Sequence, residues 1–87
     1  MKHFASSKFW LCFDQLPANI QKQARNSYEL LKQNPQHPSL QFKFIKNGKF
    51  RSVRVSLNYR ALGVPIPEGV QWFWIGNHAA YDKLAGD

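Results

Sequence analysis

The sequence predicts an α+β domain in which an N-terminal helical hairpin packs on a small antiparallel β-sheet. Two observations favour this fold. Apolar residues recur at helical spacing before residue 34 and alternate with polar residues after residue 40. Asn47-Gly48 then separates two alternating segments, as in a β-hairpin. With 87 residues the chain can form one core, so residues 1–87 are expected to be a single domain.

The first helix is expected to be short. Ser6 or Ser7 can cap it, because a serine oxygen accepts a hydrogen bond from the free N–H groups of a first turn. It should end near Gln15, before the break at Leu16-Pro17. Its apolar side would carry Phe9, Trp10 and Phe13.

A second helix is expected from Pro17 or Ala18 to Gln33. Proline is tolerated at the first helical position because its missing N–H would have no partner there. One apolar stripe follows the spacing of Ile20, Ala24, Leu31 and either Ser27 or Tyr28. Asn34-Pro35 should end the helix, since a residue before proline avoids the α conformation.

Three strands are expected to follow, over residues 40–45, 50–64 and 70–75. The Asn-Gly pair in residues 46–49 accepts the positive φ angles of a tight turn. The last strand is apolar on both faces apart from Gln71, which is typical of a central strand. After it, one helical turn is expected from Asn77 or His78. The strands together predict a three-stranded antiparallel meander with the helices on one face.

The middle strand shows two different faces. Side chains alternate across a strand, so one face is apolar and the other polar. The apolar face would carry Val53, Val55, Leu57 and Tyr59, and the polar face Ser52, Arg54, Ser56, Asn58 and Arg60. Planar guanidiniums suit bidentate phosphate binding. The polar face is therefore either a phosphate-binding surface or the ordinary solvated side of an antiparallel strand.

The charge of the chain favours an acidic partner. The formal net charge is +7, and no acidic residue occurs between Glu29 and Glu68. Nucleic acid, an anionic membrane and an acidic protein all fit such a charge. The basic residues in that interval are Lys32, Lys43, Lys46, Lys49, Arg51, Arg54 and Arg60. A membrane partner is disfavoured, because these residues lie on strand-like segments and no apolar run is long enough to span a bilayer.

Cysteine usage and the N-terminus favour a cytoplasmic protein. Cys12 is the single cysteine and lies among apolar neighbours, so it is expected to be a small buried hydrophobe. The N-terminus lacks the layout of a signal peptide. The three histidines are far apart and no Cys–His or paired-carboxylate spacing occurs, so neither a metal site nor a cofactor is expected.

The residues suited to chemistry lie at two places. Arg54 and Arg60 share the polar face, while His78 and Tyr81 follow the last strand. A histidine beside arginines suits RNA cleavage, in which a 2′-hydroxyl attacks the adjoining phosphate with the help of a base or acid and of positive charge. Tyr81 can stack on a base or orient the nucleotide. The plainer alternative is a helical His78–Asp82 pair with Tyr81 as an apolar lid.

Three segments resemble the RelE/ParE superfamily of toxins from bacterial toxin–antitoxin pairs. They are LPANIQKQARNSYELLKQNPQHPSLQFK, SVRVSLNYRALGV with its Tyr-Arg pair, and WFWIGNHAAYDKL, in which a Gly, a basic residue and a Tyr follow the last strand. The resemblance implies a RelE/ParE-like fold and a cognate acidic antitoxin as partner. It also implies messenger RNA on the ribosome as target for RelE-like members, or DNA gyrase for ParE-like members.

Carried over residue by residue, the resemblance implies catalytic roles for Arg60, His78 and Tyr81. Arg54 would share the scissile phosphate with Arg60. The flanking RNA would be bound by Arg51, Arg54, Lys43, Lys46 and Lys49. Two departures from the family pattern concern catalysis: Ser52 stands where some members have a lysine, and no carboxylate is available as a base between Glu29 and Glu68.

Three hypotheses follow from the sequence. The first is a metal-independent endoribonuclease that cleaves messenger RNA. The second is a ParE-type inhibitor of DNA gyrase without catalysis of its own. The third is an inactive relative that only binds an antitoxin. A titrating histidine beside Tyr81 favours the first, because a protein that only binds does not need one.

Overall fold

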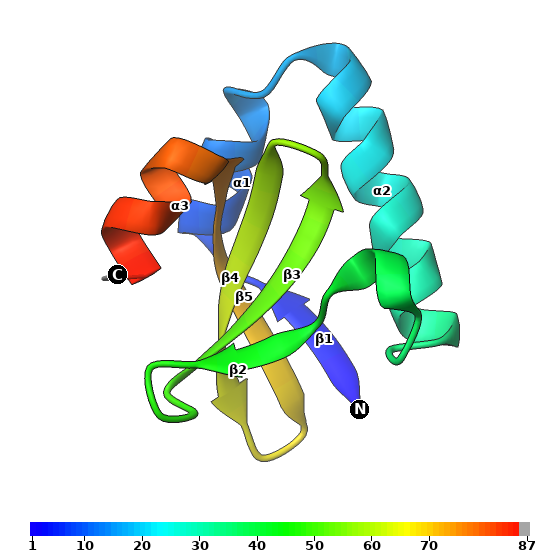
Figure 1. Ribbon diagram of the computed structural model, residues 1–87, viewed down its shortest axis with the longest axis vertical. Coiled ribbons are helices and arrows are strands. Elements are labelled where there is room, and N and C mark those ends of the chain that lie inside the picture. The colour runs from blue at the N-terminus through cyan, green and yellow to red at the C-terminus, as the bar shows by residue number, and fades with distance from the viewer. Residues whose placement is uncertain (86–87) are drawn as a thin grey trace.

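The computed structural model describes residues 1–85, which form a five-stranded mixed sheet covered by helices (Figure 1). The strand order is β1-β5-β4-β3-β2; β1 is parallel to β5 and every other pair is antiparallel. In chain order the elements are β1 (Lys2–Ala5), α1 (Ser7–Asp14), α2 (Ala18–Gln33), the 3-10 turn η1 (Pro38–Leu40), β2 (Lys43–Ile45), β3 (Phe50–Ser56), β4 (Tyr59–Ile66), β5 (Gly69–Asn77) and α3 (His78–Ala85).

The helical hairpin is confirmed. Ser6 caps α1 by accepting a hydrogen bond from the backbone N–H of Phe9 at 3.2 Å. Pro17 lies directly before α2, and Asn34 ends it before Pro35. The predicted stripe of α2 is the side that packs on the sheet, since Ile20, Ala24 and Leu31 are its buried residues. Sequence spacing therefore located both helices.

The expected strand over residues 50–64 is wrong as a single strand. The structure divides it into β3 and β4, joined by a tight turn at Leu57 and Asn58. A continuous strand of this length would extend about 50 Å, whereas the longest dimension of the molecule is 31 Å. Leu57, assigned to the apolar face, consequently lies in the turn with 76 % of its surface exposed.

The sheet also differs from the expected three-stranded antiparallel meander at its edges. β1 was not expected, and its parallel pairing with β5 makes the sheet mixed. β2 is shorter than residues 40–45, because η1 ends at Leu40 and Gln41 adopts a left-handed conformation. The single helical turn expected after β5 is the eight-residue helix α3.

The two faces of the sheet are covered by different helices. Val53, Val55 and Ala61 belong to the larger core under α1 and α2. Leu62 belongs to a smaller cluster with Tyr81 and Ala85 of α3. Because neighbouring strand residues point to opposite faces, α3 covers the face opposite to the hairpin. The expectation that all helices lie on one face is therefore wrong for α3.

Candidate functional site

A polar cleft of about 220 Å³ lies where the β3–β4 hairpin meets the start of α3. It is lined by Gln41, Arg54, Ser56, Leu57, Arg60 and His78. Three of these residues, Arg54, Arg60 and His78, were expected from the sequence to act together. The structure brings them together through a turn that the sequence interpretation had missed.

The hairpin between β3 and β4 places the two arginines side by side. Arg54 lies directly opposite Arg60 in the strand register. In a continuous strand these residues would be about 20 Å apart, whereas opposite residues of a hairpin have Cβ atoms roughly 5 Å apart. Like charges at this position oppose folding, so the pairing concentrates positive charge at the cost of stability.

Arg60 is the buried centre of the site. It was expected to face solvent, but only 3 % of its surface is exposed. Nε donates to the Ser52 hydroxyl at 3.0 Å, and the two terminal nitrogens donate to the side-chain and main-chain oxygens of Gln41 at 2.9 and 3.0 Å. Burial lowers the pKa of Arg60 and Arg54 lowers it further, while Tyr81 acts in the opposite direction. The guanidinium is thus held by three hydrogen bonds, and none of them goes to a carboxylate of residues 1–85.

His78 stands at the opening of the cleft. Its backbone N–H donates to the carbonyl of Asn58 at 2.7 Å, which joins the start of α3 to the β3–β4 turn. Its side chain is half exposed, with Nδ1 at 3.3 Å from a carboxylate oxygen of Asp82. The helical pair anticipated from the sequence is therefore present. A carboxylate on Nδ1 orients an imidazole and leaves Nε2 for chemistry.

Tyr81 lies beneath the cleft rather than within it. It is buried, and its hydroxyl accepts a hydrogen bond from Ser52 at 2.9 Å. The guanidinium carbon of Arg60 is 5.2 Å from its ring centre, and the His78 ring is 5.5 Å away. A ring in this position is covered by protein and has no free face for a nucleobase. Its contacts suit an orienting role toward Arg60 and His78.

The other expected RNA-binding residues lie outside the cleft. Lys46 and Lys49 belong to the turn between β2 and β3, and Lys43 lies opposite Ser52 on the edge strand β2. Arg51 stacks over Phe44, with its guanidinium carbon 3.8 Å from the ring centre, and donates to the carbonyl of Gly48 at 2.9 Å. These four residues form the basic end of the β2–β3 hairpin, at the other end of β3 from the β3–β4 turn that borders the cleft, and we call them the basic rim.

Gln41 and Leu57 are site residues that sequence reasoning missed. Gln41 had been placed in a strand, yet its φ of 45° is left-handed, which is uncommon for a residue other than glycine, asparagine or aspartate. No sequence signal identifies it. A sequence signal did exist for Leu57, because the following Asn58 is a turn-forming residue.

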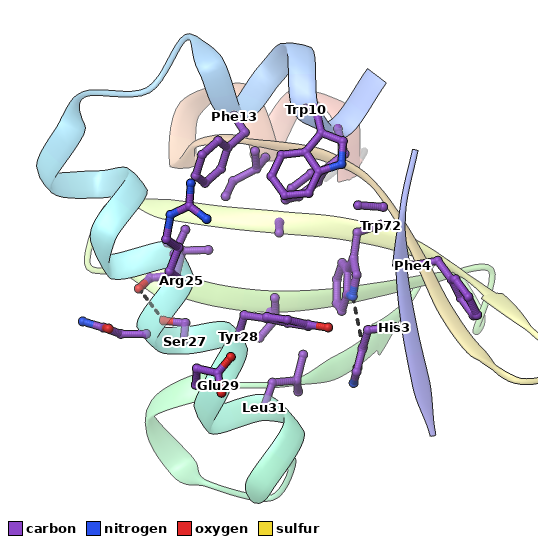
Figure 2. A pocket seen from close by; sticks show the side chains of 18 residues that line it. His3, Phe4, Trp10, Phe13, Arg25, Ser27, Tyr28, Glu29, Leu31 and Trp72 are labelled. Carbon is purple, nitrogen blue, oxygen red and sulfur yellow. Dashed lines mark hydrogen bonds between the residues drawn. The ribbon is translucent and has the colours of Figure 1, made fainter. Parts of the chain in front are cut away.

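An apolar groove of about 540 Å³ opens on the other face, between α1, α2 and the sheet. Figure 2 shows Trp10 and Phe13 from α1 above the sheet, and Tyr28 from α2 across from Trp72 and His3. Nε1 of Trp72 donates to Nδ1 of His3 at 3.1 Å. This groove offers apolar surface with few polar groups, so it suits binding rather than chemistry.

The family model described as the ParE-like toxin domain matches residues 18–83. This chain belongs to the RelE/ParE superfamily of toxins. The match covers α2, the antiparallel strands and most of α3, and so includes every residue of the cleft. The resemblance seen in the three sequence segments is thus confirmed. No curated protein matches the toxin in sequence.

Solved structures share the fold of this toxin over nearly its whole length. It is similar to the toxin of the RelB–RelE antitoxin–toxin complex from Methanococcus jannaschii, with a TM-score of 0.72, 14% identity, and coverage of 93% of this chain and 96% of that one. It is also similar to the YoeB/ParE toxin from Agrobacterium tumefaciens, with a TM-score of 0.67, 14% identity, and coverage of 90% of this chain and 99% of that one. A third similar structure is YafQ in the DinJ–YafQ complex from E. coli, with a TM-score of 0.64, 14% identity, and coverage of 91% of this chain and 94% of that one.

Two of these toxin relatives were thus crystallised with their antitoxins, RelB and DinJ. At such low identity the likenesses establish only the α+β fold of N-terminal helices on a five-stranded sheet. Residues 1–85 contain no helix long and apolar enough to cross a bilayer. They also contain no group of three or more His, Cys, Asp or Glu side chains placed to hold a metal ion.

Proposed function

We propose that this toxin is an endoribonuclease that cleaves messenger RNA on the ribosome. The observation that carries the proposal is the meeting of Arg54, Arg60 and His78 in one polar cleft. A cleft with two guanidiniums attracts a phosphate, and the half-exposed imidazole of His78 at its opening can serve as a general acid or base.

In the proposed reaction the 2′-oxygen forms a bond to phosphorus while the bond from phosphorus to the 5′-oxygen breaks. The products are a 2′,3′-cyclic phosphate and a 5′-hydroxyl. Arg60 and Arg54 stabilise the charge on the phosphate oxygens in the transition state. His78 acts as general base or general acid, with Asp82 orienting its ring, and the second proton exchanges with water. Tyr81 orients Arg60, and the basic rim binds the flanking RNA.

The second candidate function is inhibition of DNA gyrase. The observation that favours it is the family match, whose description is the ParE-like toxin domain. In this case the cleft and the basic rim would contribute charge to a protein or DNA surface, and His78 would have no catalytic part. Substitution of His78 or Arg54 would lower the rate of RNA cleavage under the first function, but would change only the affinity for the target under the second.

Primer extension on messenger RNA from cells that express the toxin tests the proposal. We expect new 5′ ends that disappear in Arg54→Ala, because Arg54 lines the cleft without being fully buried. Lys22→Ala is the matched control, since it removes one exposed charge from α2, outside the residues that line the cleft. Gyrase-dependent DNA breaks without new RNA ends would instead establish the second function.

We further propose that a cognate acidic antitoxin binds this toxin and suppresses its activity. The formal charge of +7 favours an acidic segment, and the groove of Figure 2 offers apolar surface to the same partner. Co-expression with the neighbouring genes should give a co-purifying acidic protein whose affinity falls with added salt. Purification of the toxin alone from such cells would contradict this proposal.

A further inference from the structure

Within residues 1–85, the hydrogen-bond acceptors of the buried cation Arg60 are all uncharged. They are the Ser52 hydroxyl and the two oxygens of Gln41. Buried arginines ordinarily pair with a carboxylate, because an uncompensated charge inside a protein costs several kcal/mol. Within residues 1–85 the ion pairs are Lys32–Glu29 and His78–Asp82, and neither involves Arg60. No carboxylate of residues 1–85 therefore neutralises the positive charge of Arg60.

Gln41 supplies two of the three acceptors through an unusual backbone conformation. Its φ of 45° and ψ of 44° are left-handed, at the end of η1. This conformation directs the carbonyl and the side-chain amide oxygen of one residue to the two terminal nitrogens of the guanidinium. Strained backbone of this kind persists where the surrounding structure requires it, and it is frequent at functional sites.

A glutamate at this position would make the stronger bond to Arg60. A carboxylate and a guanidinium form a charge-assisted pair, roughly twice as strong as a bond to a neutral oxygen. It would also neutralise the guanidinium and repel a phosphate. The amide of Gln41 holds the guanidinium in the same geometry, but it neither neutralises the charge nor repels a phosphate.

We infer that Gln41 is a positioning residue: it fixes the Arg60 guanidinium at the cleft through neutral acceptors and so leaves its charge for a phosphodiester phosphate. This inference rests on the proposed function for the identity of the ligand. An arginine has five N–H donors, and the acceptors named above engage three of them. Donors thus remain for a phosphate oxygen in the cleft.

The test compares Gln41→Glu with Gln41→Met and with Gln23→Glu. The first adds a carboxylate beside Arg60, and the second removes the amide acceptor without adding charge. Gln23 is exposed on α2, so Gln23→Glu is the control for the change in net charge. The probe is a single-stranded oligodeoxyribonucleotide, which lacks the attacking 2′-hydroxyl and is bound without being cut. Affinity, its salt dependence and the thermal midpoint are measured for all proteins.

The inference predicts opposite rankings for binding and stability. Relative to Gln23→Glu, Gln41→Glu should bind the probe about 10- to 100-fold more weakly, since one charged contact is lost. Its log–log salt slope should flatten by about 0.7, and its thermal midpoint should rise. Gln41→Met should lose less affinity than Gln41→Glu and should have a lower midpoint than the parent.

Three outcomes overturn the inference: Gln41→Glu binds as tightly as Gln23→Glu, its thermal midpoint falls below that of Gln41→Met, or the parent protein does not bind the probe. A parent that binds the probe and shows the predicted rankings, yet cuts no RNA, refutes the proposed endoribonuclease function and leaves the role of Gln41 intact.

Discussion

The two faces of this sheet differ in the polar groups that they bury. Under α1 and α2 the face is apolar, with Val53 and Val55 packed against the helices. Under α3 the same strand buries Ser52 completely, and its neighbour β4 buries Arg60. Burial of an apolar side chain stabilises the fold by about 1.5–3 kcal/mol, whereas a buried guanidinium with neutral partners opposes folding. The face under α1 and α2 therefore provides apolar stabilisation, whereas the face under α3 holds, beside its small apolar cluster, a charge that opposes folding.

The comparison predicts that function and stability can be changed separately. Residues at the opening of the α3 face should affect activity, and residues under α1 and α2 should affect the free energy of unfolding. The four predictions below begin with the largest expected effect and end with the smallest.

His78→Ala should lower the rate of RNA cleavage roughly 10²- to 10⁴-fold, the usual contribution of one general acid or base. The thermal midpoint should hardly change, because the side chain is half exposed and its pair with Asp82 is a surface pair. RNA binding should weaken far less than the rate, since the arginines supply the charge. Single-turnover cleavage and oligonucleotide binding measure the two effects, and a variant with the parent rate would remove His78 from the mechanism.

Val55→Ala should lower the free energy of unfolding by on the order of 1–3 kcal/mol, because it creates a cavity in the core under α2. The cleavage rate per folded molecule should stay at the parent value. Urea denaturation and an assay at low denaturant measure these quantities. If activity falls while the unfolding midpoint stays constant, the assignment of functions to the two faces is wrong.

Tyr81→Phe should cost about 1 kcal/mol of stability, since the buried Ser52 hydroxyl loses its acceptor. The ring remains against Arg60, so cleavage should fall less than tenfold if Tyr81 only orients its neighbours. Thermal unfolding and cleavage assays on the purified variant measure both. A loss comparable to that of His78→Ala would instead identify the phenol as a proton donor.

His3 should make the stability of the apolar face depend on pH. Burial is the main cause that lowers its pKa below the ordinary value of about 6.5, and the N-terminal ammonium and Lys32 add to it. The unfolded chain therefore binds more protons between the lowered pKa and about 6.5. The contribution of His3 is complete above that range and is lost as the pH falls through it. The free energy of unfolding of His3→Gln, measured across pH 5 to 8, should lack this pH-dependent contribution.

The helices and the Asn-Gly turn could be predicted from the sequence because their signals are local. Ser6, Asn34-Pro35 and Asn47-Gly48 act on the backbone within a few residues, and each lies where it was expected. The division of residues 50–64 was missed because alternation continues through a two-residue turn. Strand length would have revealed it, since strands of more than ten residues are unusual in small proteins.

The composition of the cleft was largely predictable, whereas its burial was not. Arg54, Arg60 and His78 were selected by chemical type and place along the chain, and they do line one cleft. The burial of Arg60 and Tyr81 depends on α3 covering the second face of the sheet, and the sequence had indicated only one turn of that helix. Gln41 reaches Arg60 through tertiary structure alone, so neither periodicity nor composition identifies it.

The pairing of β1 with β5 has a consequence for how the chain is made. Ribosomes synthesise proteins from the N-terminus, so residues 2–5 are made well before their partners in the sheet, from Gly69 to Trp72. Contacts between such distant segments form slowly. His78 and Tyr81 of α3 follow even later in the chain. A nascent chain therefore cannot complete the cleft until the start of α3 has been synthesised.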